Sequence, residues 1–69
     1  MPILIFKSNI DCHAKLEQLE AVLCREQDVH SWTVDLEDCD KVLRIITKKA
    51  IKNKLLTLLK NSGFEISDL

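Results

Sequence analysis

The fold is decided by residues 32–47, Trp-Thr-Val-Asp-Leu-Glu-Asp-Cys-Asp-Lys-Val-Leu-Arg-Ile-Ile-Thr. Apolar and polar residues alternate over Trp32–Leu36, which is the pattern of a half-buried strand. The acidic cluster at 37–40 supplies turn residues, and the β-branched run Val42–Thr47 predicts a second strand. This stretch therefore predicts a β-hairpin near the middle of the chain.

A strand and a helix are expected before this hairpin. Residues 3–7 are rich in β-branched and aromatic side chains and too few for a helix, so they predict a strand. Leu16, Leu19 and Leu23 follow helical spacing and would share one face, so a helix is expected over this region. It should begin near residues 11–13.

A second helix and a fourth strand are expected after the hairpin. Helical spacing runs from Lys48 to Ser62, Gly63 stands where a left-handed C-terminal cap is expected, and Phe64–Ile66 predicts a short strand. The order β-α-β-β-α-β predicts an α+β fold, the ferredoxin-like βαββαβ plait. Its four-stranded antiparallel sheet would carry both helices on one face.

The composition predicts one small globular domain spanning residues 1–69. Of these 69 residues 46% are hydrophobic, and the net charge is −1. Disordered chains combine low hydrophobicity with a high net charge, and this chain has neither. A net charge this close to zero gives the chain no overall electrostatic attraction to nucleic acid or to anionic membranes. A large ligand pocket takes roughly 300 Å³ or more, so we expect a binding or carrier protein and no enzyme.

The chain carries no signal for a membrane or for export. No run without Asp, Glu, Lys or Arg is longer than six residues, whereas a membrane span needs about 20 apolar residues. The amino-terminal sequence lacks the pattern of a signal peptide. Three cysteines, an odd number, cannot all pair within one chain. We therefore expect a cytoplasmic protein.

The loop before the first helix, residues 8–15, offers the most chemistry. Cys12 stands at the start of that helix, where unpaired backbone N–H groups and the positive end of the helix dipole favour a thiolate. A thiolate is both a nucleophile and a ligand for soft metals. The alternative is that Cys12 is a small apolar residue at the mouth of the core.

In this loop and beyond it, the chain resembles the heavy-metal-associated domain of copper chaperones and metal-transport ATPases. That family carries Met-x-Cys-x-x-Cys here, and this chain has Ile10, Cys12 and Lys15 at the three positions. Further likeness lies in residues 19–23, 29–36 and 63–64. The resemblance implies a ferredoxin-like fold and Cu(I) binding, with a degenerate Cys-x-x-Lys motif in place of Cys-x-x-Cys.

The degenerate motif supplies one thiolate where the family holds Cu(I) with two. Lys15 is a cation and cannot replace the second sulfur, although its charge could offset that of a shared bis-thiolate site. Three donors could complete the site: the imidazole of His13, an external thiol such as glutathione, or Cys12 of a second chain. Cys12 and His13 are thus the expected ligands for Cu(I) or another soft metal. The alternative is that metal binding has been lost and the scaffold alone persists.

The other two cysteines are expected to be bystanders. Cys24 follows Cys12 by about three helical turns, roughly 18 Å along the axis. Cys39 stands in the hairpin turn, which we expect to lie away from the loop that carries Cys12.

Two surfaces are candidates for partners. Residues 17–40 hold eight acids and one arginine, whereas residues 44–60 hold six bases and no acid. The strand alternation places Leu4, Phe6, Leu43 and Ile45 toward the helices. It leaves an open sheet face formed by Ile3, Ile5, Val42 and Ile46.

The expected partner is a metal-transport protein or a second copy of the chain, bound through Cys12 or through the open sheet face. RNA-recognition motifs share the predicted topology, but they stack bases on aromatic side chains of the third strand. Residues 41–46 contain no aromatic side chain, so we expect no nucleic-acid binding. Three functions remain as alternatives: a weak or shared-site binder of soft metal, a metal-independent interaction module and a redox-responsive thiol.

Overall fold

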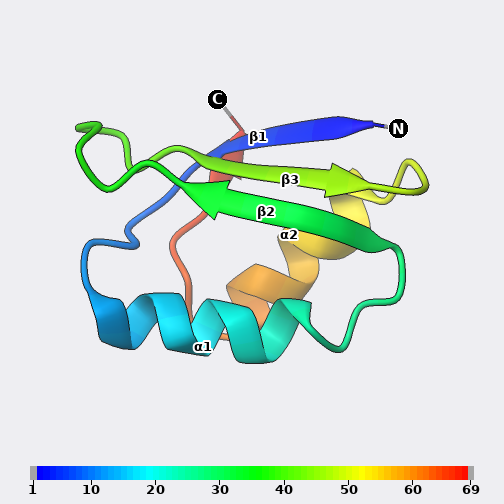
Figure 1. The fold of residues 1–69 in the computed structure, drawn as a ribbon, viewed down its shortest axis with the longest axis horizontal. Coiled ribbons are helices and arrows are strands. Elements are labelled where there is room, and N and C mark those ends of the chain that lie inside the picture. Colours follow the sequence, from blue (N-terminus) through cyan, green and yellow to red (C-terminus); the bar gives the residue numbers. More distant parts are fainter. Residues whose placement is uncertain (1, 69) are drawn as a thin grey trace.

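The computed structural model describes residues 2–68 and contains six elements in the predicted order (Figure 1). They are β1 (Ile3–Lys7), α1 (His13–Leu23), β2 (Val29–Val34), β3 (Leu43–Thr47), α2 (Lys52–Asn61) and β4 (Ser67–Asp68). The predicted α+β ferredoxin-like plait is confirmed.

The four strands form one antiparallel sheet in the order β2-β3-β1-β4. β1 lies between β3 and β4, with Phe6 opposite Leu43 on one side and opposite Asp68 on the other. Both helices lie on the same side of the sheet, below it in Figure 1. β1 and β3 are therefore the central strands, as the crossover connections require.

The core forms between the sheet and the two helices. Phe6, Leu43 and Ile45 are fully buried, and Leu4 is 8% exposed. The predicted inward face is thus confirmed. On the opposite face Ile3 is 62% exposed and Ile5 40% exposed. The leucines of the helices complete the core: Leu19, Leu23, Leu55 and Leu59.

The second helix begins later than predicted. The helical spacing placed its start at Lys48, whereas α2 begins at Lys52. The backbone N–H of Lys48 donates to the carbonyl of Asp28 at 2.7 Å, and the hydroxyl of Thr47 donates to the carbonyl of Lys49 at 2.6 Å. These bonds hold the chain in a bend after β3, so the helix forms only beyond it.

The fourth strand also lies further along the chain than predicted. Phe64–Ile66 was expected to form it, but β4 comprises Ser67–Asp68. The backbone N–H of Phe64 is used by the end of α2, and that of Glu65 donates to the side chain of Asn9 at 3.3 Å. Phe64 and Ile66 are nevertheless buried in the core.

Gly63 ends α2 in the left-handed conformation that the sequence predicts, with φ of 95°. The N–H of Gly63 donates to the carbonyl of Lys60 at 3.1 Å, and the N–H of Phe64 donates to that of Leu59 at 3.1 Å. This pair of bonds is the Schellman motif. It turns the chain so that Phe64 enters the core.

In the part of the chain that the structure describes, neither helix has the length and apolar character needed to cross a bilayer.

Replacing Gly63 by Ala should lower the free energy of unfolding by about 1 kcal/mol, because a side chain is strained at this φ. A Cβ at this position would meet no atom within 4 Å, so the loss would come from the backbone alone. Urea denaturation measures it. Asn61→Ala, on the exposed end of the same helix, is the control and should cost nothing comparable. Equal stability of Gly63→Ala and the parent protein would contradict this reading of the cap.

Candidate functional site

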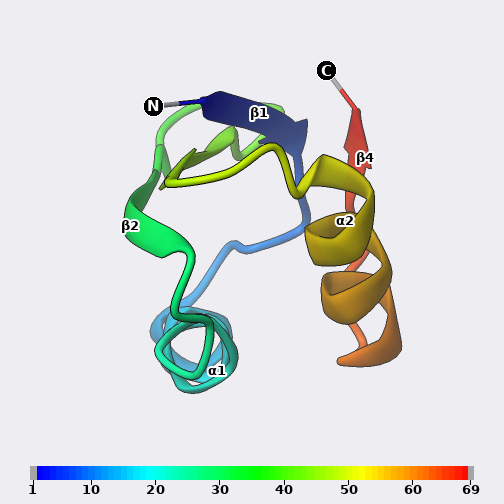
Figure 2. The same ribbon diagram turned by 90° about the vertical axis from the view of Figure 1, so that its right-hand side faces the viewer.

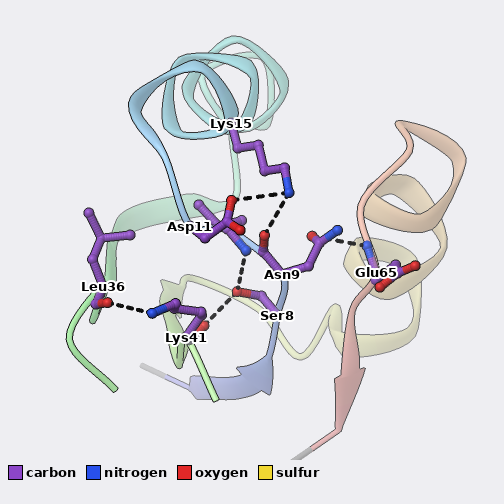
Figure 3. A network of polar contacts seen from close by, with 8 residues as sticks. Ser8, Asn9, Asp11, Lys15, Leu36, Lys41 and Glu65 are labelled. Atoms are coloured by element: carbon purple, nitrogen blue, oxygen red, sulfur yellow. Dashed lines mark hydrogen bonds and ion pairs between the residues drawn. The ribbon is translucent and has the colours of Figure 1, made fainter. Parts of the chain in front are cut away.

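Three segments meet at one end of the molecule: the β1–α1 loop (residues 8–12), the hairpin turn (35–42) and the segment that precedes β4 (64–66). Ser8 joins the first two, because its N–H donates to the carbonyl of Asp40 at 3.1 Å and its hydroxyl to that of Lys41 at 2.5 Å. Asn9 joins the first and the third, because its side-chain oxygen accepts the N–H of Glu65 at 3.3 Å. Figure 3 shows the bonds of the Ser8 hydroxyl and of the Asn9 side chain converging on the loop.

Ile10 fixes the loop from inside. Its side chain is fully buried, and its N–H donates to the hydroxyl of Ser8 at 3.3 Å. An apolar anchor two residues before Cys12 therefore restrains the backbone that presents the thiol.

Cys12 is exposed and is the N-cap residue of α1. Its backbone is extended, with φ of −151° and ψ of 165°, and its carbonyl accepts the N–H of Leu16 at 3.1 Å. Its side chain makes no capping hydrogen bond to the helix. The expectation that Cys12 stands at the start of the helix is confirmed, and the alternative of a thiol buried at the mouth of the core is wrong. His13, the first residue of α1, is also exposed.

Lys15 folds back over the loop. Its ammonium group lies 3.0 Å from the carbonyl oxygen of Asn9 and 3.1 Å from a carboxylate oxygen of Asp11 (Figure 3). The hydrogen bond and positive charge of Lys15 hold the pKa of Asp11 below its usual range. Lys15 therefore closes the loop by contacting both Asn9 and Asp11.

The described residues bring no third ligand to Cys12 and His13. Among residues 2–68, the one group of three or more metal-ligating side chains within 4.8 Å of one another is Asp38, Cys39 and Asp40. Asp38 accepts the N–H of Asp40 at 2.8 Å, and Asp40 lies 3.5 Å from the ammonium group of Lys7. The first contact lies within the turn, and the second joins the turn to β1.

The placement of Cys39 differs from the prediction. It was expected away from the β1–α1 loop, but the hairpin turn that carries it is bonded directly to Ser8. The reason is topological: β1 and β2 are both antiparallel to β3, so they run parallel and their C-terminal ends lie at the same end of the sheet (Figure 1). Cys24 caps the other end of α1, where its thiol lies 3.3 Å from the carbonyl of Ala21.

A hollow of about 230 Å³ adjoins the loop on the side of β4. Its lining includes Lys7, Asn9 and Glu65, and Cys12 is not part of it. Sequence reasoning missed Ser8 and Asn9 as the residues that tie the loop to its neighbours. The available signal was their type, because Ser and Asn side chains directly after a strand commonly bond to backbone groups.

Comparisons of this chain with family models, curated proteins and solved structures found no match. The resemblance to the heavy-metal-associated domain therefore stays a prediction.

Substituting Lys15 by Gln should raise the pKa of Asp11 toward its ordinary value, because both the charge and the charge-assisted hydrogen bond weaken. The Asp11 carboxylate is stabilised by folding, so its contribution to stability is present at neutral pH and is lost as the pH falls through the lowered pKa. A carboxyl NMR titration measures the shift.

The matched control is Lys54→Gln, because Lys54 pairs with Glu26 at 3.3 Å in another part of the molecule. It should leave the Asp11 titration unchanged. An Asp11 titration that is the same in Lys15→Gln and in the parent protein would show that the two side chains do not interact in solution.

Proposed function

We propose that this protein binds a soft monovalent metal ion, Cu(I) first among them, through the thiolate of Cys12 in the manner of a degenerate heavy-metal-associated domain. The observation that carries the proposal is the exposed Cys12 side chain at the N-cap of α1, with no capping bond to the helix. Soft cations prefer thiolate ligands.

The restrained loop also supports binding. Ile10 is buried on one side of the thiol, and Leu16 bonds to the Cys12 carbonyl on the other. A ligand on a fixed backbone loses little conformational freedom when it binds. Zinc fits less well, because a closed zinc site takes four ligands and the loop offers Cys12 and His13.

The charge of the loop favours His13 as the second donor. The ammonium group of Lys15 is already paired with Asp11 at 3.1 Å, so it has little charge left to offset the anion that two thiolates and one Cu(I) would form. A neutral imidazole avoids that excess negative charge. An external thiol and Cys12 of a second chain are the other two donors that the proposal allows.

The proposal is tested by adding Ag(I), as a redox-stable substitute for Cu(I), while recording amide NMR spectra and the ultraviolet absorption of the metal–thiolate bond. We expect shifts confined to the neighbourhood of Cys12, His13 and Phe64. Cys12→Ser should abolish the absorption and these shifts, and His13→Gln should weaken binding.

Cys24→Ser and Cys39→Ser are the matched controls, because both thiols are also exposed and the chemical change is the same. Each should retain the shifts near Cys12. Equal binding by Cys12→Ser and the parent protein, or no response of the parent protein even with added glutathione, would contradict the proposal.

The second candidate function is a metal-independent interaction module. The observation that favours it is the open sheet face, where Ile3 is 62% exposed and Ile5 40% exposed. Apolar side chains grouped on a surface often mark an association site. In either case we place the protein in the cytoplasm, where a reducing environment keeps exposed thiols free. A metal-transport protein is the partner that the first function implies, and neither function includes a catalytic step.

A further inference from the structure

β2 is an open edge of the sheet, with a single register shift, between Val29 and Ser31, near its start. It is the outermost strand in the order β2-β3-β1-β4, and no strand of residues 2–68 lies beyond it (Figure 2). Its six residues, Val-His-Ser-Trp-Thr-Val, include no Asp, Glu, Lys, Arg or Pro. Edge strands are commonly protected by such residues or by being short. The opposite edge, β4, has only two residues.

The backbone of β2 has groups free for pairing. The N–H of Asp35 donates to the carbonyl of Val42 at 3.0 Å, toward β3. Along an antiparallel strand, residues that bond to one neighbour alternate with residues that face the other side. Trp32 and Val34 therefore direct their N–H and C=O groups toward the free edge.

Hollows flank this edge. One of about 370 Å³ lies between β2 and the end of α1, with Leu23, Val29 and Trp32 in its lining. Another of about 260 Å³ is lined by residues of β2 together with Ile3, Arg44 and Ile46 of the open face. Side chains of an added strand would alternate between the two faces of the sheet, and each face has a hollow to receive them.

The charges at the two ends of β2 are complementary. The turn that follows it, residues 35–41, has four acids and one lysine. At its other end the backbone N–H of Lys48 donates to the carbonyl of Asp28, which places the Lys48–Lys49 pair beside the start of the strand, where its two positive charges exceed the one negative charge of Asp28. When two β2 strands pair antiparallel, the acidic turn of each copy lies at the lysine end of the other.

We propose that β2 pairs antiparallel with β2 of a second copy of this chain, about a two-fold axis at Thr33. Two-fold pairing closes the assembly at two subunits and leaves no free β2 edge. Val34 of each copy then lies near the hollow beside Trp32 of the other. The Cys12 loops stay exposed at opposite ends of the joined sheet, so the proposal does not rest on metal binding.

Sedimentation equilibrium under reducing conditions, from micromolar to near-millimolar protein, tests this assembly. We expect a reversible monomer–dimer equilibrium and a concentration-dependent change in the fluorescence of Trp32, the one tryptophan of the chain. Thr33→Lys places like charges on the two-fold axis and should weaken association by at least about tenfold. Thr57→Lys makes the same change at an exposed position of α2 and should leave association unchanged.

Exchanging the charges at the two ends of β2 tests whether the two β2 strands pair antiparallel. The double variants Lys48→Glu/Lys49→Glu and Asp35→Lys/Glu37→Lys should each associate more weakly than the parent protein, because their strand ends carry like charges. An equal mixture of the two should recover association, since each acidic end then meets a basic one.

A monomer at every concentration would overturn the proposal, and so would a dimer that Thr33→Lys does not weaken. Failure of the mixture to recover association would overturn the antiparallel orientation. Cys12→Ser should dimerise as the parent protein does, so this test and the metal titration can fail independently.

Discussion

The burial of Phe6 at the end of β1 is the constraint on which the rest of the structure depends. Phe6 is fully buried, and it lies opposite Leu43 of β3 and Asp68 of β4. Its position ties the central strand to both neighbours just before the chain leaves the sheet. The β1–α1 loop therefore starts from a fixed point, and Ile10 returns it to the core only four residues later. The thiol of Cys12 stays at the surface, because the apolar residues before it in the chain, Phe6 and Ile10, are the ones that enter the core.

Much of the fold could be predicted because it depends on local patterns. The alternation in β1 and β3 identifies the inward face, and Gly63 identifies the end of α2. The start of α2 and the place of β4 could not be predicted in this way. They depend on contacts between distant parts of the chain, such as the bond from Glu65 to Asn9 across 56 residues. Such contacts exist only once the sheet has formed.

The candidate site was predictable to a similar degree. The boundary between strand and helix predicts that Cys12 stands at the start of the helix, and the structure adds that it is the exposed N-cap residue. The role of Lys15 was missed, although its spacing of four residues from Asp11 is typical of an ion pair on a helix. The proximity of the hairpin turn was missed as well, because it follows from the parallel course of β1 and β2 and from no local pattern.

The central claim is that Cys12 supplies the sulfur for a soft metal ion. X-ray absorption at the copper edge, on protein loaded with Cu(I) without added thiol, tests it most directly. The account predicts one sulfur and one lighter donor in the parent protein, with the sulfur lost in Cys12→Ser. Identical copper spectra for the two proteins would contradict it.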